Sequence, residues 1–374
     1  MELDDQELDN ALRFTTSVEG TPCPTLTGLL LIGKKARLRK LVPTAESAIQ
    51  VMEGTTVKVN ESFTLPLLAA LEKISEYFNA WNPEEEIEDD LFRMAVPHYD
   101  KRAFREALIN AFCHRDYSML GRVRVLINQE GLLISNPGGF IEGITYKNLI
   151  DAEPHGRNPV LSDCLKRIGL AERTGRGIDR IFEGSLKYGK PLPDYSQSTP
   201  TMVKVFIPNA LPDKAFIAML LQEQKEKHFT FSIYSLFILN ALKKQPRMQS
   251  SDLMRTLALD KSRLQVALES LVEAGLIESI GHGKSRAYIL SAKVYKAAGN
   301  ISGYIHQKDI SEVRYPELIL TLLQKQKEIS RQDVADLLHI TPAAAYRLLQ
   351  KLRKQHKIVL DGKGRSAKYI LPSS

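Results

Sequence analysis

The chain has 374 residues of ordinary globular composition, 43% hydrophobic and 25% charged, and its length suits roughly two to four domains. Its net charge of +7 favours a polyanionic partner. The three cysteines are too few and too scattered for a disulfide framework or a zinc site, so we expect reduced thiols in a cytoplasmic protein. The longest apolar run, Leu29–Ile32, is far too short for a membrane-spanning helix, so we expect no membrane partner.

The N-terminal part predicts short elements of mixed α/β character. That apolar run lies within Thr25–Lys34, which we interpret as a buried strand. Further short pieces of α/β character are expected at Ala45–Val51 and Val57–Val59, and an amphipathic helix at Leu65–Trp81. The acidic sequence NPEEEIEDD, residues 82–90, predicts a linker or an exposed turn.

A helix in the sequence AFREALINAFCHRDYS has two chemically different faces. At 100° per residue, Leu108 and Phe112 fall beside Phe104, while Glu106 and Asn110 lie together on the opposite side. An amide oxygen can bind Mg²⁺, and a carboxylate can orient an attacking water, so this pair suits a magnesium nucleotide. The alternative is an ordinary solvated helix face.

Two glycine-containing segments follow this helix. Residues 123–135 predict a hairpin that leads into the turn Asn136-Pro137-Gly138-Gly139, where glycines let a ligand approach the backbone. Gly175-Arg176-Gly177 precedes a predicted helix, whose N-terminal amides can bind phosphate. Each segment alone also fits an ordinary turn or the cap of a preceding helix.

The three segments in this order resemble the GHKL-type (Bergerat) ATP-binding fold. The sequences REALINAFCHRDY, ISNPGG, RNP and GLAERTGRGIDRI are more closely similar to the ATP-binding C-terminal domain of RecG-related, Schlafen AlbA-like bacterial regulators. This resemblance covers about half the chain, from Thr25 to Pro208. It also implies that the N-terminal residues are the end of an AlbA-like domain whose upstream half is absent from this chain.

The resemblance implies a role for each matching residue. Glu106 takes the place of the catalytic base and Asn110 that of the Mg²⁺ ligand. The turn residues Asn136, Gly138 and Gly139 correspond to the adenine side of the site, and Gly175, Arg176 and Gly177 correspond to the phosphate loop. Better-known relatives carry an aspartate where Asn136 stands, so the resemblance implies ATP binding more strongly than ATP hydrolysis.

Two further arginines are candidate nucleotide contacts. His114, Arg115 and Asp116 end the central helix, and three interpretations stay open: a catalytic His–Asp pair, a nucleotide contact by Arg115, or a C-terminal cap. We favour the cap with some nucleotide role. Arg157 lies in a segment, residues 155–159, that is interpreted either as a lid over the phosphates or as an ordinary loop.

The C-terminal third contains an internal repeat. An ungapped shift of 81 residues aligns ILNALKKQ, from Ile238, with ILTLLQKQ, from Ile319, and GHGKSRAYIL with GKGRSAKYIL. Each copy predicts three helices followed by a hairpin, which resembles the bacterial winged helix-turn-helix. In the second copy the helices are expected at residues 315–326, 330–338 and 341–356, with the hairpin at 363–370.

A winged helix binds DNA through its third helix and through cations on the hairpin, or wing. Candidate DNA-binding residues of the first copy are Lys261, Arg263, Lys284 and Arg286. Those of the second copy are Thr341, Ala344, Tyr346, Arg347, Lys363, Arg365 and Lys368. The alternative is that these are solvated charges on a packing module. For the first copy, a role in dimerisation or packing is an equal alternative.

Charge separates the two copies. Residues 228–290 contain eight Lys or Arg against five Asp or Glu, whereas residues 314–374 contain twelve against five. The second copy is therefore the stronger candidate for binding double-stranded DNA.

Together these features predict an α/β (α+β) protein. The expected domains are an AlbA-like remnant at residues 1–60, a GHKL-like α/β sandwich that binds ATP and Mg²⁺ at 61–210, and winged helices at 228–292 and 311–374. The favoured function is a dimeric DNA-binding transcriptional regulator with a nucleotide-sensing domain. Alternatives are an ATPase acting on nucleic acid and a nucleotide-free dimerisation scaffold; a helicase is not expected, because no GxxxxGK[ST] loop is present.

Overall fold

A computed structural model describes residues 4–89, 92–153, 155–172, 174–281, 286–297, 315–338, 342–361 and 368–372. The chain divides into two compact units, Met1–Phe237 and Ile238–Ser374. Four candidate DNA-binding residues, Lys284, Thr341, Lys363 and Arg365, lie outside the described residues.

Residues 5–41 form small helices and one hairpin. The elements are α1 (Asp5–Leu12), β1 (Thr15–Val18), β2 (Thr21–Pro24), α2 (Leu26–Ile32) and α3 (Lys35–Leu41). The strand expected at residues 25–34 is therefore wrong. Thr25 accepts a hydrogen bond from the Gly28 amide, and this N-cap starts a helix that buries Leu29, Leu30 and Leu31.

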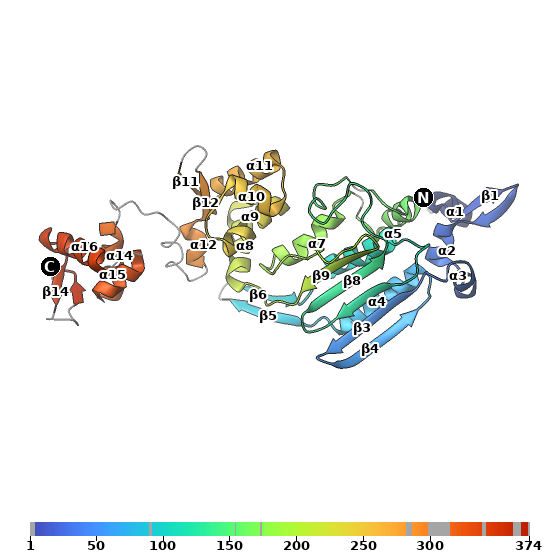
Figure 1. The fold of residues 1–374 in the computed structure, drawn as a ribbon, viewed down its shortest axis with the longest axis horizontal. Coiled ribbons are helices and arrows are strands. Elements are labelled where there is room, and N and C mark those ends of the chain that lie inside the picture. Colours follow the sequence, from blue (N-terminus) through green and yellow to red (C-terminus); the bar gives the residue numbers. More distant parts are fainter. Residues whose placement is uncertain are drawn as a thin grey trace. The chain divides into compact units, whose positions relative to one another are not determined.

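A five-stranded sheet organises the first unit, in the order β4-β3-β7-β8-β9 (Figure 1). Only β3 and β7 pair in parallel; the other neighbours are antiparallel. The expected hairpin of β7 and β8 is confirmed. The short α/β pieces expected near residues 47 and 57 are strands in the structure. The strands are β3 (Ser47–Glu53), β4 (Thr56–Phe63), β7 (Val123–Ile127), β8 (Gly131–Pro137) and β9 (Met202–Pro208).

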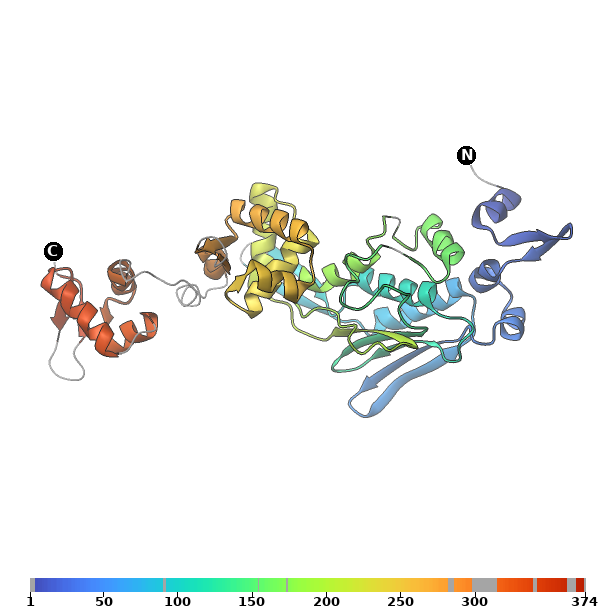
Figure 2. The ribbon, with the colours of Figure 1, turned by 45° about the horizontal axis from the view of Figure 1, so that its top comes forward.

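Helices α4 (Leu67–Ala80) and α5 (Lys101–His114) cover one face of this sheet (Figure 2). Phe78 of α4 stacks on Phe104 of α5 with ring centroids 3.6 Å apart, and both side chains are buried. The face of α5 that the sequence assigns to the core is therefore in the core.

Helix α7 (Gly177–Leu186) packs closely along α5, and α6 (Pro159–Arg167) precedes it. Gly184 allows the close approach, because a methyl group added there would lie 2.5 Å from Cβ of Ala103. This packing places the N-terminus of α7 beside the middle of α5.

Most of the acidic segment, Glu84–Asp89, is a strand rather than the expected linker or turn. Strands β5 (Glu84–Asp89) and β6 (Phe92–Pro97) form an antiparallel hairpin. Ile87 and Val96 are buried against Ile217 of α8 (Lys214–Lys227), and Met94 packs on the same cluster. These apolar contacts anchor the acidic strand β5.

The second half of the chain contains two modules with the same order of elements. The first has α9 (Ile233–Lys244), β10 (Met248–Gln249), α10 (Ser250–Leu257), α11 (Lys261–Glu273), β11 (Ile277–Ile280), β12 (Ala287–Leu290) and α12 (Ala292–Ala297). The second has α14 (Tyr315–Gln326), β13 (Glu328–Ile329), α15 (Arg331–Leu338), α16 (Pro342–Lys354), β14 (Val359–Asp361) and β15 (Lys368–Ile370).

Their sheets confirm the repeat at the level of topology. The strand orders are β10-β12-β11 and β13-β15-β14, with every pair antiparallel. In the second module a single buried cluster joins the three helices to the hairpin. The mixed α/β fold class with winged-helix modules is therefore confirmed.

Among the described helices, none combines the length and the apolar character that crossing a bilayer requires.

Candidate functional site

A cavity of about 190 Å³ opens between α5, the β8–β9 end of the sheet and the N-terminus of α7. Its wall brings together residues that are separated along the sequence by up to 99 positions, from Glu106 to Val205. The sequence-predicted residues that line it are Glu106, Asn110, Asn136, Gly139, Gly175 and Gly177.

Glu106 is a buried carboxyl group, only 6% exposed, and not part of a solvated helix face. Gly177 lies directly on it: a methyl group added to that glycine would be 2.2 Å from Oε1 of Glu106. Burial raises the pKa of Glu106, the nearby charge of Glu172 raises it further, and Arg105 lowers it. A carboxyl group with a raised pKa in a pocket is suited to proton transfer.

The segment before α7 supplies a second carboxylate. Glu172 accepts a hydrogen bond of 2.9 Å from the Thr174 hydroxyl, which lowers its pKa, and its Oε2 lies 3.5 Å from Nε of Arg180. Arg180 also pairs with Glu183 at 3.2 Å. Arg180 is thereby held on α7 by two carboxylates, and its charge lowers the pKa of Glu106 only slightly.

The Asn136–Gly139 turn forms the opposite wall. Asn136 is 3% exposed and donates through Nδ2 to the Pro137 carbonyl, 3.2 Å away, which holds its carboxamide at the pocket. Gly139 lies so close to the backbone that an added methyl group would be 2.2 Å from the carbonyl oxygen of Pro200. A side chain at position 139 would therefore displace the start of β9.

The phosphate-loop candidate adopts a conformation that favours glycine. Gly175 has φ of +77°, and Arg176 is the N-cap residue of α7 without a side-chain capping bond. Gly175 and Gly177 line the pocket, whereas Arg176 is exposed and does not. Backbone amides of this helix end can therefore face an anion.

Arg157 acts on the turn rather than on the pocket. Its guanidinium donates to the carbonyl of His114, 3.2 Å away, and to that of Gly139, 3.1 Å away. The added-methyl position of Gly138, whose φ is +95°, lies 3.3 Å from Nε of Arg157. Arg157 thus fastens the turn to the end of α5. Neither Arg157 nor Gly138 lines the pocket.

Arg115 is turned away from the pocket, which corrects the expected nucleotide contact. Its side chain is 1% exposed and donates to the carbonyls of Thr44 and Gly121, the latter at 2.8 Å. Burial lowers its pKa. Arg115 is the C-cap residue of α5, and its side chain joins the following loop to the segment before β3.

The pocket also contains residues that sequence reasoning missed. The carboxylates of Glu153, Glu172 and Asp179 and the amine of Lys166 line it together with Glu106. Glu172 and Asp179 stand inside the GLAERTGRGIDRI sequence, so their place on either side of the glycines is the signal that points to them. The apolar part of the lining includes a buried tyrosine and several apolar residues, among them Tyr195, Ile134, Phe140, Val203 and Val205.

These donors fit a magnesium nucleotide better than a free nucleotide. The apolar lining can cover a base, Asn110 can give an amide oxygen to Mg²⁺, and the α7 amides can bind phosphate. Carboxylates outnumber amines in the lining, so a bare triphosphate would be repelled unless a divalent cation accompanied it. No group of three metal-ligating side chains occurs among the described residues, so the phosphates would have to complete the coordination of the ion.

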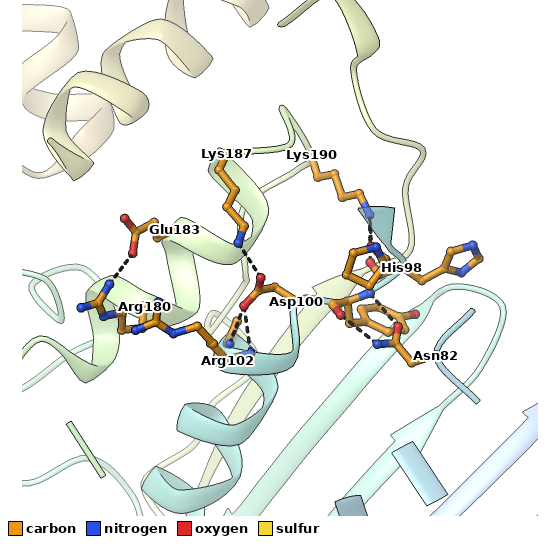
Figure 3. Close-up of polar contacts among 11 residues, drawn as sticks. Asn82, His98, Asp100, Arg102, Arg180, Glu183, Lys187 and Lys190 are labelled. Carbon is orange, nitrogen blue, oxygen red and sulfur yellow. Dashed lines mark hydrogen bonds and ion pairs between the residues drawn. The ribbon is translucent and has the colours of Figure 1, made fainter. Parts of the chain in front are cut away.

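The far end of α7 is anchored firmly to α5 (Figure 3). Nζ of Lys187 lies 2.6 Å from Oδ2 of Asp100, and Oδ1 of Asp100 caps α5 by accepting from the amides of Arg102 and Ala103. The amine of Lys190 donates to the carbonyls of Pro97 and His98 at 3.0 and 2.9 Å. Burial lowers the pKa of Lys190 to about 8.

The candidate DNA-binding helices are α11 and α16. On α16, Tyr346 and Arg347 are exposed and Ala344 is half-buried; Lys368 lies exposed on β15. On α11, Lys261 and Arg263 are exposed, but Arg263 pairs with the capping Asp260 at 3.1 Å. Arg286, just before β12, is exposed as well.

Comparison with known proteins gives two partial matches to families. Residues 121–207 match the family described as "Putative ATP-dependent DNA helicase recG C-terminal", and residues 236–278 match "Winged helix-turn-helix DNA-binding". No curated protein matches the chain. The first match includes β7, β8, α7 and β9 but begins after α5, so Glu106 and Asn110 lie outside it.

Among solved structures, the chain is similar to the DIP2311 protein from Corynebacterium diphtheriae, with a TM-score of 0.66 and 19% identity over 99% of this chain. The chain spans 65% of the length of that structure. A second similar structure is Staphylococcus aureus MarR in complex with salicylate and kanamycin, with 18% identity, a TM-score of 0.18, and coverage of 30% of this chain and 83% of that one. The first likeness shows a shared fold, in agreement with an ATPase-like domain followed by a winged helix.

Proposed function

We propose that this protein is a DNA-binding transcriptional regulator of the cytoplasm whose ATPase-like domain binds Mg-ATP and controls DNA binding, with the chain acting as a dimer. The observation that carries the proposal is the pocket at the N-terminus of α7, where Glu106, Asn110, Asn136 and the two glycines of the phosphate loop meet. It occurs in a chain that also carries winged-helix modules. The kinship with Schlafen AlbA-like regulators belongs to the same proposal and is supported by the sequences around the site.

Nucleotide binding is tested by thermal unfolding with and without Mg-ATP, on the parent and on Asn110→Ala. A ligand at about 100 times its dissociation constant adds roughly 2.7 kcal/mol to the free energy of unfolding, enough to raise Tm by several degrees. We expect a shift in the parent that Asn110→Ala removes. No shift at millimolar Mg-ATP would reduce the domain to a nucleotide-free scaffold.

Control of DNA binding is tested by fluorescence anisotropy with labelled duplex DNA, with and without Mg-ATP. The double variant Arg365→Ala, Lys368→Ala removes two wing cations, so we expect weaker binding to every sequence and a flatter salt dependence. An affinity that is the same with and without nucleotide would separate DNA binding from nucleotide sensing.

ATP hydrolysis is a second candidate function, favoured by the buried carboxyl group of Glu106 with its raised pKa. If it operates, the parent releases phosphate from Mg-ATP and Glu106→Gln does not, while both proteins still bind the nucleotide. Phosphate release that survives Glu106→Gln would assign the activity to another group or to a contaminant.

A further inference from the structure

A dense run of positive charge lies at the short helix α3, nearly 200 residues before the winged helices along the chain. Most residues between positions 34 and 40 are lysine or arginine, and residues 20–45 contain no aspartate or glutamate. All of these cations are exposed, and none lines the nucleotide pocket. They are Lys34, Lys35, Arg37, Arg39 and Lys40.

A buried leucine fixes the face that α3 turns to solvent. Leu38 is fully buried and anchors the helix on the first unit. At about 100° per residue, Ala36 and Lys40 lie opposite Leu38. Arg37 and Arg39 stand on either side of them. The outward face of α3 is therefore small at its centre and cationic around it.

Several of these charges oppose the stability of the helix that carries them. The N-terminal end of a helix is partially positive, so acidic residues are favourable there and cations are not. Lys34 is the N-cap residue of α3 and makes no side-chain capping bond, and Lys35 occupies the first helical position. Lys35 and Arg39 are four residues apart, a spacing at which like charges repel. Only Arg39 and Lys40, in the last turn, suit the helix dipole.

The fold does not offset this charge with carboxylates. Elsewhere in the first unit exposed cations are paired, such as Lys58 with Glu53 at 3.1 Å and Arg122 with Glu46 at 3.2 Å. Within the part of the chain that the structure describes, no carboxylate pairs with a cation of α3. Charge that lowers helix stability and has no partner in the fold indicates an anion that comes from outside.

Duplex DNA is the polyanion that the rest of the chain favours. Residues 236–278 match a DNA-binding winged helix, and DNA phosphates are contacted largely by lysine and arginine. A membrane surface is also anionic, but helices that lie on membranes turn large apolar residues toward the lipid. The outward face of α3 has Ala36 there instead, and the exposed Leu41 lies on the Leu38 side at the end of the helix.

We propose that α3 is a second DNA-binding surface, whose cations contact the phosphate backbone of the duplex to which the winged helices bind. Phosphate contacts carry no sequence information, so α3 adds affinity and salt dependence without sequence preference. The inference does not require nucleotide binding and is tested without nucleotide.

The first test is fluorescence anisotropy of the full chain on a labelled random-sequence duplex, between low and moderate salt. Arg39→Gln with Lys40→Gln removes two cations but keeps good helix formers. We expect at least about a threefold loss of affinity, and the slope of log affinity against log salt should fall by nearly two. Lys58→Gln with Lys73→Gln removes the same charge from paired positions and should stay close to the parent. Arg39→Lys keeps the charge and should bind like the parent.

Lys35→Glu separates a role in DNA binding from a role in the fold. An acid at the first helical position suits the dipole and ends the repulsion with Arg39, so we expect Tm to rise by about 1–2 °C. The affinity for the duplex should fall, and more than in Lys58→Glu, which changes the net charge equally. If Tm and affinity fell together, Lys35 would serve the fold and the proposal would be overturned.

Other outcomes also decide against α3. Equal affinity and salt slope in the Arg39, Lys40 variant and its charge-matched control would overturn the proposal, as would a parent chain that binds no duplex at low salt. Cosedimentation with vesicles of phosphatidylcholine and phosphatidylserine tests the membrane. If the parent binds these vesicles, and the Arg39, Lys40 variant loses that binding but keeps its DNA affinity, the face belongs to a lipid surface.

Discussion

Glu106 faces the pocket from α5 while Gly177 packs on its carboxyl group, so its surroundings favour the neutral acid. The helical wheel places this residue opposite the core but cannot show that α7 covers it, because that contact joins residues 71 positions apart. Arg115 shows the same limit: its partners are backbone carbonyls of distant loops, and no sequence pattern marks a carbonyl as an acceptor. Glycine spacing is informative, since a close approach excludes a side chain.

Glu106→Gln is expected to stabilise the protein at neutral pH. The raised pKa means that the folded protein binds more protons than the unfolded chain above the usual pKa of glutamic acid, so the contribution of Glu106 to stability is lost as pH rises through the raised pKa. Glutamine does not ionise, so the variant avoids that loss. Its higher free energy of unfolding relative to the parent should vanish below the usual pKa of glutamic acid. Denaturant unfolding of parent and variant at neutral and acidic pH measures this, with Glu130→Gln at the exposed turn as control. A variant that is less stable at neutral pH would show that the carboxylate is well satisfied in the fold.

Gly177→Ala and Gly139→Ala are expected to have different consequences. The new methyl group at position 177 would meet the end of the flexible Glu106 side chain, which can move aside, whereas that at position 139 would meet the backbone of Pro200. Gly177→Ala should therefore reduce the Tm shift by Mg-ATP with little change in Tm itself. Gly139→Ala should lower Tm directly. Equal loss of Tm in both variants would mean that Glu106 is held rigidly.

At the scale of elements, hydrophobic periodicity predicts α4, α5, the β7–β8 hairpin and the helices of the second module close to their observed bounds. It fails where one local interaction decides the structure. Leucines at residues 29–31 suit a strand or a helix equally, and the Thr25 cap selects the helix. In β5 a single buried Ile87 among glutamates gives too little alternation to indicate a strand, and its pairing with β6 and burial against α8 supply the rest.

Gly184→Ala tests the close packing of α7 on α5. The added methyl group would lie 2.5 Å from Cβ of Ala103 and 2.9 Å from Cβ of Asp100, so the helices must separate near the Lys187–Asp100 pair. Overpacking of this kind costs about 1–3 kcal/mol. The free energy of unfolding from denaturant titration measures it, and Glu183→Ala on the solvent side of α7 serves as control, with an expected change near zero. A neutral Gly184→Ala would show that α7 can shift along α5 without cost.

For the whole molecule, the repeat is the strongest sequence signal. One fixed shift of 81 residues aligns both the first helices and the hairpins of the two modules, and chance rarely produces such an ungapped match. The net charges of the two modules already differ at the level of amino-acid composition. The fold shows which residues of α11 and α16 are exposed. The difference in total charge can therefore be located on the exposed face of each third helix. We therefore base the proposed roles of the two modules on surface residues over a common core.

Paired substitutions on the two third helices test this division of roles. Arg347→Ala with Lys351→Ala removes two exposed cations from α16, and Lys261→Ala with Arg263→Ala removes two from α11. If α16 lies in the major groove, the first variant binds DNA more weakly at moderate salt, and the slope of log affinity against log salt falls by about one for each phosphate that is no longer neutralised. The second variant should keep nearly the parent affinity and slope, because the glutamates of α11 keep that helix away from phosphates. Anisotropy titrations between low and moderate salt measure both quantities on the same duplex. A larger loss from the α11 variant would reverse the assignment and make the first module the DNA reader.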